Sequence, residues 1–330
     1  MPAPPDVTSF PRAGRPGVDP AQPLGAKKWR DGGADGRRNG YTGQVLRNPF
    51  PRSRVRVGRG LAWSLIILVA CATVLEATAA GQWRRGRRSE RARVATPADF
   101  DSGFQFCRVM FGRGRGGDGG RWSVDFPRAD INVSIRLAEL TKTLVSQDQY
   151  GDPKHLVVRL TDDELFRCPF IMMTEVGAAY IDDAEAARLR EYLLKGGFLW
   201  ADDFWGTYAW ESWATEIGRV LPPSEYPILD IDESHPLFRT HFSVDRMPQI
   251  SSINYWAGSG GRTSERGSDS AVVHTRAISD QDGRIMVLMT HNTDIGDSWE
   301  READDPEYFL RFAIDGYAVA INVLIYAMSH

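Results

Sequence analysis

Cysteine and histidine are scarce in this chain, which has three cysteines and six histidines in 330 residues. No two cysteines are spaced as CxxC, and no Cys/His grouping has the spacing of a structural zinc site, so that class of site is excluded. Cys71 lies in a hydrophobic run, which leaves Cys107 and Cys168 in the remaining C-terminal part. They allow at most one disulfide, and their spacing leaves open whether they meet. Internal repeats at solenoid periods are also lacking.

A strong net charge is absent too, because the formal net charge is only -3. This small value conceals an asymmetry: residues 1–93 hold 18 Lys and Arg against 6 Asp and Glu, whereas residues 94–330 hold 22 against 37. Residues 1–60 are rich in Pro, Gly and Arg and poor in aliphatic residues, which predicts a disordered basic tail. Since Gly and Pro dilute the arginines, we interpret this tail as solvated and expect no nucleic-acid partner.

A hydrophobic segment, 61–83, follows several arginines and contains no charge over its first fifteen residues. It is short for a transmembrane anchor, which needs about 20 apolar residues. It also has the basic start, apolar middle and small-residue exit of a secretory signal, and Leu68-Val-Ala-Cys71 resembles a lipobox that would lipidate Cys71. All three alternatives predict an extracytoplasmic protein of the cell envelope, periplasmic or secreted, which contacts the membrane through 61–83 if this segment is not cleaved. Residues 84–103 read as a linker.

From residue 104 onward, short apolar runs alternate with helix-like stretches, which is typical of an α/β domain with a mostly parallel sheet. The expected strands are 104–111, 155–160, 170–174, 198–201 and 284–290, and the expected helices are 130–145, 182–195, 208–220 and 308–328. Asp130 is the expected N-cap of the first helix. We interpret 308–328 as a core helix rather than a membrane span, because Arg311, Asp315 and Asn322 interrupt it.

Carboxylates follow two of the expected strands. Asp202 and Asp203 come directly after 198–201, and Glu175 comes after 170–174. In an open α/β sheet, ligands bind at the carboxyl ends of the strands, so this edge is the candidate binding site. Adjacent side chains on a strand point to opposite faces, so at most one of the two aspartates faces the crevice. Helix capping is an alternative role for them. Trp205 could offer a stacking surface for a sugar.

Two histidines have polar neighbours. His291 follows the strand 284–290 and is close in sequence to Asn292 and Asp294, a grouping suited to a hard cation or a sugar. An Asx-turn loop is the structural alternative. His235 lies in the motif Ser-His-Pro. No EF-hand spacing is present, and we assign neither metal ligands, nor catalytic residues, nor a cofactor.

Several motifs together resemble a bacterial family, domain of unknown function 4159. They are Phe126-Pro-Arg-Ala-Asp130, Arg159-Leu-Thr-Asp-Asp-Glu-Leu-Phe166, Pro169-Phe-Ile-Met-Met173, Gly196-Gly-Phe-Leu-Trp-Ala-Asp-Asp-Phe-Trp205, Asp232-Glu-Ser-His-Pro-Leu-Phe238, His291-Asn-Thr-Asp294 and Ile321-Asn-Val-Leu-Ile-Tyr-Ala-Met328. The resemblance covers 104–330 and implies a flavodoxin-like sandwich of the class I glutamine-amidotransferase type. It also implies export and a place in an envelope protein complex, since such proteins tend to be encoded near MoxR-type ATPases and von Willebrand factor A proteins. It implies no activity.

The sequence departs from true amidotransferases at the turn that carries their cysteine nucleophile. Here that turn is Ala201-Asp-Asp-Phe204, and Cys168 lies before the preceding strand. Cysteine-dependent glutamine hydrolysis is therefore not expected. The leading hypothesis is a module that binds a glycan or a partner protein. The alternatives are a hydrolase of glycans or esters that uses a carboxylate and a histidine, with or without a metal, and a structural subunit of an envelope complex.

Overall fold

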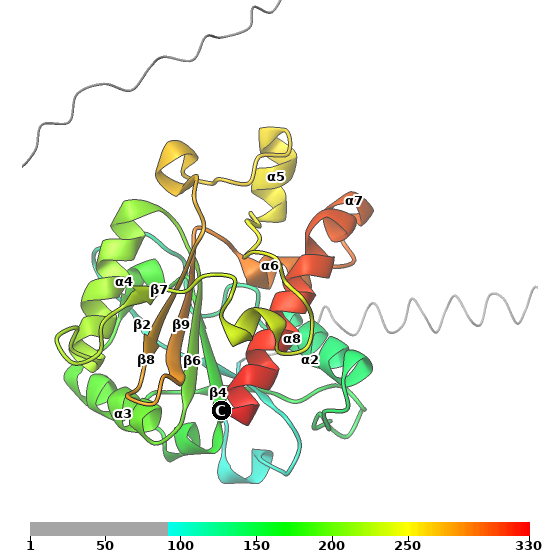
Figure 1. Ribbon diagram of the computed structural model, residues 1–330. Coiled ribbons are helices and arrows are strands. Elements are labelled where there is room, and N and C mark those ends of the chain that lie inside the picture. The colour runs from blue at the N-terminus through cyan, green and yellow to red at the C-terminus, as the bar shows by residue number, and fades with distance from the viewer. Residues whose placement is uncertain (1–91) are drawn as a thin grey trace, which may run out of the picture. The chain divides into compact units, whose positions relative to one another are not determined.

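The computed structural model describes residues 92–330, which form an α/β/α sandwich around a seven-stranded sheet (Figure 1). The tail 1–60, the hydrophobic segment 61–83 and the first part of the linker lie outside the described residues. The strands of the main sheet are β1 (Phe106–Val109), β3 (His155–Val158), β4 (Phe170–Thr174), β6 (Phe198–Phe204), β7 (Leu229–Asp230), β8 (His274–Ser279) and β9 (Ile285–His291). A separate two-stranded sheet pairs β2 (Gly112–Arg113) with β5 (Ala179–Tyr180).

The strand order is β3-β1-β4-β6-β9-β8-β7. The first five strands of this order are parallel, and β8 and β7 extend the sheet in antiparallel fashion. Among the parallel strands the chain order reverses between β1 and β4, as in flavodoxin-like folds. The prediction of a mostly parallel α/β sheet of flavodoxin-like type is therefore confirmed.

Helices cover both faces of the sheet (Figure 1). One face carries α3 (Asp183–Leu194) and α4 (Gly206–Val220), and the other carries α2 (Arg128–Leu140), α6 (Ile295–Glu300) and α8 (Ile314–Ser329). The short helices α5 (Ile253–Ser259) and α7 (Pro306–Tyr308) lie beyond one end of the sheet, and a π-helical turn, Phe309–Ala313, joins α7 to α8. The single-turn 3-10 helices are Pro97–Asp99, Asp163–Arg167, Val176–Ala178, Pro236–Arg239 and Gly267–Ser270.

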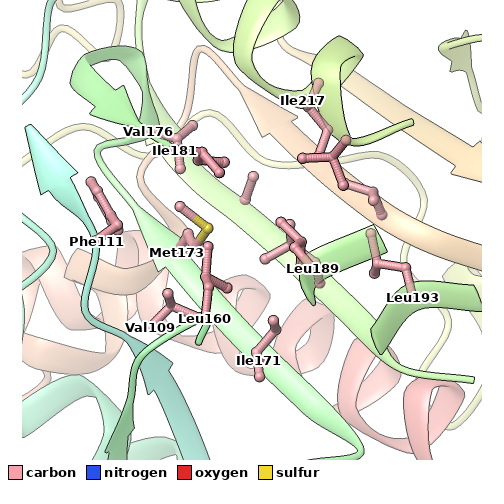
Figure 2. Packing of buried hydrophobic residues seen from close by; sticks show 14 of the residues in the cluster. Val109, Phe111, Leu160, Ile171, Met173, Val176, Ile181, Leu189, Leu193 and Ile217 are labelled. Atoms are coloured by element: carbon pink, nitrogen blue, oxygen red, sulfur yellow. The ribbon is translucent and has the colours of Figure 1, made fainter. Parts of the chain in front are cut away.

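Each face of the sheet buries its own apolar core. Figure 2 shows part of the core beneath α3 and α4, where Ile171 and Met173 of β4 pack against Leu189 and Leu193 of α3. The central strands β4 and β6 are buried on both faces, which explains why they read as continuous apolar runs. Burial of this kind stabilises the fold by about 25 cal/mol for each Å² of apolar surface.

Two helix boundaries illustrate what local sequence determines. Asp182 caps α3 in a complete capping box with Glu185, and Gly196 follows the helix with a positive φ of 105°, as the sequence predicts. The expectation that Asp130 is an N-cap is wrong. Asp130 is the third residue of α2 and fully buried, because a buried arginine described below needs its carboxylate.

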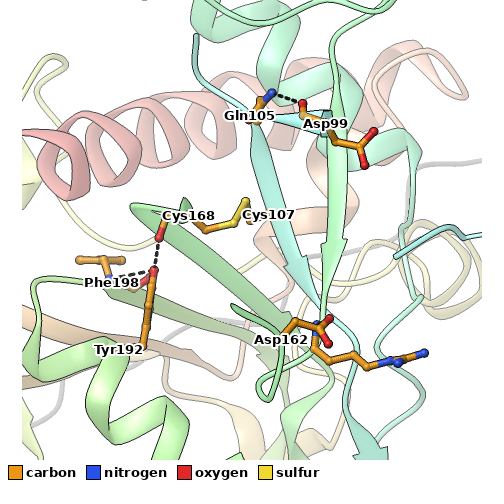
Figure 3. Close-up of a disulfide and its surroundings, with 8 residues drawn as sticks. Asp99, Gln105, Cys107, Asp162, Cys168, Tyr192 and Phe198 are labelled. Carbon is orange, nitrogen blue, oxygen red and sulfur yellow. Dashed lines mark hydrogen bonds between the residues drawn. A yellow bond between two sulfur atoms is a disulfide. The ribbon is translucent and has the colours of Figure 1, made fainter. Parts of the chain in front are cut away.

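Cys107 of β1 and Cys168, two residues before β4, form a disulfide (Figure 3). The two strands are neighbours in the sheet. Beside the disulfide, the Tyr192 hydroxyl donates to the carbonyl oxygen of Cys168 at 2.8 Å and accepts from the backbone N–H of Phe198 at 3.3 Å. The bridge therefore lies in a packed interior and closes a loop with a sequence separation of 61 residues.

The C-terminal helical segment, Pro306–Ser329, is long and apolar enough to cross a membrane by length and composition. Within the described residues it also fills the core, since 61% of its most apolar window is buried in the protein. Asn322 is buried too: it donates to the Phe242 carbonyl and accepts from the N–H groups of His241 and Phe242. Its burial agrees with the sequence interpretation as a core helix.

Candidate functional site

The carboxyl edge of the sheet concentrates backbone strain. Among residues 92–330, four residues other than glycine have positive φ: Asp125, Glu175, Asp203 and Asn292, with φ between 56° and 66°. Glu175 and Asn292 directly follow β4 and β9, Asp203 lies near the end of β6, and Asp125 precedes α2. Each such conformation costs on the order of 1–3 kcal/mol and persists only where surrounding contacts impose it. Three of the four residues are among those predicted for the site.

Asp202 is fully buried inside β6, which extends three residues beyond the predicted strand. One oxygen accepts from the Thr290 hydroxyl, and the other accepts from the backbone N–H of Gly296 at 3.0 Å. The Trp200 indole N–H in turn donates to the Thr290 hydroxyl oxygen at 2.8 Å. Burial raises the pKa of Asp202 to about 7, although these hydrogen bonds oppose the shift. The carboxyl therefore belongs to the interior, where it ties β6 to β9 and α6.

Asp203 turns to a different set of partners. Its Oδ1 accepts from the Trp205 indole N–H at 2.9 Å, and both side chains are only 5% exposed. Burial and the neighbouring charge of Glu175 raise the pKa of Asp203 well above its ordinary value. A bulge against β9 between Ala201 and Phe204 accompanies the positive φ. Trp205 is thus a hydrogen-bond partner in the interior and not an open stacking surface.

Glu175 lies where two loops meet. Its Oε2 accepts from the Gly120 N–H at 2.6 Å, and burial raises its pKa, with Glu265 and Asp118 adding repulsion. The glycine-rich loop 114–121 is held further by an ion pair between Asp118 and Arg266 at 2.9 Å. The Gly117 N–H also donates to the Tyr208 hydroxyl at 3.0 Å. Both contacts are exposed, and an exposed ion pair such as that of Asp118 and Arg266 contributes at most about 1 kcal/mol.

The aspartates of the edge come together with one residue that the sequence did not single out, Asp125. Carboxylate oxygens of Asp125, Asp203 and Asp294 all lie within 4.8 Å of one another. A second group of oxygens, from Asp125, Asp297 and Glu300, meets the same limit. Burial and the charges of neighbouring aspartates raise the pKa of Asp125 and Asp294, and burial raises the pKa of Asp297. The motif Phe126-Pro-Arg-Ala-Asp130 was the available signal, because Asp125 immediately precedes it.

Arg108 is a fully buried cation near this cluster. It lies in β1, and its guanidinium makes hydrogen bonds to both oxygens of Asp130 and to the Val124 carbonyl. Asp130 is equally buried. The pair occupies the region beside β1 where the strand order reverses. Because Arg108 is hydrogen-bonded to Asp130, it offsets the negative charge of the other carboxylates only through longer-range electrostatic attraction.

His291, Asn292 and Asp294 perform structural tasks at the end of β9. The Nε2 of His291 donates to the Gly206 carbonyl at 3.0 Å, and its Nδ1 lies 3.0 Å from an Arg276 guanidinium nitrogen. Burial, Arg276 and His274 lower the pKa of His291 to about 4, so it is neutral at pH 7. The Asn292 side chain accepts from the Gly206 N–H and donates to the Val272 carbonyl. Asp294 accepts from the N–H of Asp297 and caps α6.

His235 does not join these residues. It caps the short helix Pro236–Arg239 and contacts the ring of Tyr326. Tyr326 packs on Phe198, the first residue of β6, and its hydroxyl accepts from Ile285, the first residue of β9. His235 therefore lies at the amino ends of these strands, opposite Asp202. The structure brings together seven of the eight predicted site residues and separates His235 from them.

A pocket lies near the carboxylates described above, but none of them lines it. A pocket of about 750 Å³ is lined by the end of β7, the start of β8, the segment 246–249 and the beginning of α8. Two of its lining residues contact Asn292: Val272 through its carbonyl and Gln249 through its amide. The exposed side chains of Arg246 and Arg311 line the pocket together with Asp230 and other acidic residues. It therefore opens at the carboxyl edge, next to β9.

Comparison with known proteins finds a match to a family model. The model of a domain of unknown function, DUF4159, matches residues 105–328, which is more than half of the chain and nearly all of the described part. A search of curated proteins finds no match.

Proposed function

Since the chain belongs to the DUF4159 family, whose description gives no activity, we propose a function from the geometry of the domain: an exported binding module for a polar ligand of the glycan class. The carrying observation is the open pocket of about 750 Å³ beside the carboxyl edge. This volume is within the range of small-molecule sites, about 300–1,000 Å³. The proposal includes attachment to the membrane through 61–83, unless that segment is cleaved, and assembly with other envelope proteins.

The disulfide supports the extracytoplasmic part of this proposal. Cys107 and Cys168 are bonded in the interior of the sheet. Structural disulfides persist in oxidising compartments such as the periplasm and are rare in the cytosol. An exported domain of this size would gain stability from the bridge, whereas a cytosolic one would be kept reduced.

Two observations favour binding over amidotransferase or histidine-dependent chemistry. Both cysteines of the described part are in the disulfide, so neither offers a thiolate. His291 has both ring nitrogens engaged, and His235 lies at the other end of the sheet from Asp202 and Asp203. A general base needs a free nitrogen within reach of the reacting proton. The two histidines predicted for the site therefore offer no free base beside Asp202 and Asp203.

The charges of the pocket indicate the kind of ligand. Arg246 and Arg311 are exposed, and neither forms an ion pair with any other part of residues 92–330. Free guanidinium groups bind carboxylates or phosphates in bidentate fashion. Asp230 and Asp232 also line the pocket, and their carboxylates can accept hydrogen bonds from hydroxyls. A hydroxyl-rich ligand with an anionic group, such as an acidic glycan, fits this combination of charges.

Calorimetric titration of the full chain with neutral and acidic soluble glycans tests the proposal. Saturable binding of an acidic glycan that Arg246→Ala and Arg311→Ala each weaken on the order of tenfold is expected from the loss of one charge-assisted contact. Arg190→Ala is the matched control, because Arg190 is a partly exposed arginine paired with Glu225 outside the pocket. Equal affinities for all three variants, or no glycan binding at all, would contradict the assignment.

A metal-assisted hydrolase acting on a glycan or ester is the second candidate, and the buried aspartate cluster is the observation that favours it. Carboxylates can hold a cation that activates water. Turnover of a glycan or ester panel in the presence of Mg²⁺, Mn²⁺ or Ca²⁺, abolished by Asp203→Asn, is the expected result for this candidate. Glycan binding without turnover would reject the hydrolase and support the binding module.

A further inference from the structure

We propose that Asp125, Asp203 and Asp294 form a binding site for one hard divalent cation, of the Ca²⁺ or Mg²⁺ type. The site is separate from the ligand pocket, so the inference does not depend on glycan binding, and it names the residues that the hydrolase candidate would need for its cation. The three residues come from different parts of the chain: the loop before α2, the end of β6 and the loop after β9. The fold, and not a local motif, brings them together.

The spacing of the oxygens fits a shared cation. All three residues offer an oxygen within 4.8 Å of the other two. Oxygens bound to one Ca²⁺ at about 2.4 Å can be up to about 4.8 Å apart, and those bound to Mg²⁺ up to about 4.2 Å. The donors are all carboxylates, which suit hard cations rather than zinc or copper.

Asp125 supplies an independent observation. Its side chain is 8% exposed, and its Oδ2 is buried with no hydrogen-bond partner in the part of the chain that the structure describes. A buried polar atom without a partner costs about 1–3 kcal/mol unless something satisfies it. This atom and an Asp294 oxygen lie on the same side of Gly296, because a Cβ added at Gly296 would lie 2.8 Å from Asp125 Oδ2 and 3.5 Å from Asp294 Oδ1. The orphaned oxygen is therefore directed into the cluster.

The charge balance points the same way. Across residues 92–330, no lysine or arginine forms an ion pair with Asp125, Asp203 or Asp294, and the nearby Arg108 is bound to Asp130. Asp203 and Asp294 are 5% and 4% exposed. Like charges this close and this buried require either protons or a cation. A divalent cation would neutralise the cluster and also satisfy Asp125 Oδ2.

The second group of oxygens, from Asp125, Asp297 and Glu300, is a weaker candidate. Arg301 lies 2.6 Å from a Glu300 oxygen and 3.3 Å from an Asp297 oxygen. The other Asp297 oxygen accepts from the Ile253 N–H and from the Tyr308 hydroxyl. Since these carboxylates already have a cation and donors, they provide the matched controls for the experiment.

Terbium luminescence tests the site in the full chain. Tb³⁺ replaces Ca²⁺ at oxygen sites, and Trp205, whose indole is hydrogen-bonded to Asp203, can sensitise it. We expect tryptophan-sensitised emission that Ca²⁺ displaces, and a loss of affinity on the order of tenfold or more in Asp125→Asn, Asp203→Asn and Asp294→Asn, because ligand charge sets cation affinity. Glu300→Gln should retain the wild-type affinity.

Three outcomes would overturn the proposal: no displaceable emission from the wild-type chain, unchanged affinity in Asp203→Asn and Asp294→Asn, or loss in Glu300→Gln alone. The emission lifetime of the wild-type chain in H₂O and D₂O gives a second test that needs no variant. A buried site leaves few water molecules on the ion, whereas hydration close to that of the free ion would also refute the assignment. Arg246→Ala should leave the emission unchanged, so failure of the glycan proposal and failure of the cation site are distinguishable.

Discussion

Removal of the Cys107–Cys168 disulfide should destabilise the domain by about 4 kcal/mol at 25 °C. The bridge closes a loop with a sequence separation of 61 residues. In the chain-entropy description, cross-linking this loop removes about 14 cal/mol/K from the entropy of the unfolded chain, which corresponds to that free energy. Typical stabilities are about 5–15 kcal/mol, so the loss would be a large fraction of the total.

Urea unfolding of the full chain, with and without a reducing agent, measures this effect. Oxidised wild-type protein should unfold at a higher urea concentration and with a smaller m value, because its cross-linked unfolded state is more compact. The double variant Cys107→Ala/Cys168→Ala should match the reduced wild type apart from the small packing change. It should also be insensitive to the reducing agent, which makes it the control.

The result that would refute this reasoning is a difference below about 1 kcal/mol between oxidised and reduced wild-type protein. Such a value would mean that the loop is already restricted in the unfolded chain, or that the sulfur atoms pack equally well unbonded. Loss of stability in the double variant with no response to reduction in the wild type would attribute the effect to packing instead.

Three further predictions concern the buried polar groups. The pKa of His291 falls from an ordinary 6.5 to about 4 in the folded protein, so the unfolded chain takes up the proton first and stability is lost as the pH falls from about 6.5 to 4; His291→Gln should remove about 3 kcal/mol of this loss in pH-dependent urea unfolding. Arg108→Met should cost about 3–5 kcal/mol because it leaves Asp130 buried and unpaired, whereas Arg108→Met/Asp130→Leu should recover most of that loss in the same assay. Gly296→Ala would place a methyl group 2.8 Å from Asp125 Oδ2, so it should lower the melting temperature and weaken terbium binding, and unchanged values of both would contradict the observed geometry.

Local sequence predicted the layers of the fold well. Apolar runs such as 170–174 and 198–201 are buried on both faces of a parallel sheet, and each must alternate with a covering helix. The capping box at Asp182 fixes the start of α3 through hydrogen bonds between residues that lie within one four-residue segment. Such patterns depend only on residues that are close together in the sequence, so they can be recognised without the tertiary structure.

For the site, the sequence predicts the location at the carboxyl ends of the strands but not the contacts of its side chains. Alternation along β6 predicted different surroundings for Asp202 and Asp203, but burial of both depends on loops that cover the strand ends. Asp125 was missed because its role arises from distances to residues far along the chain. Asp130 was mistaken for a cap since nothing local indicates that Arg108, 22 residues earlier, requires its carboxylate. Tertiary electrostatics decided these cases.

The disulfide has a consequence for attachment as well as for stability. It encloses the glycine-rich loop 114–121, α2 and β3 in one covalent ring. A protease that cuts an exposed loop inside this ring leaves two fragments joined through sulfur, so the residues after the cut stay tethered to the chain's N-terminal segment. A cut after Cys168 gives no such retention. A nick between Cys107 and Cys168 therefore leaves the C-terminal part attached, whereas a nick after Cys168 releases that part once it unfolds.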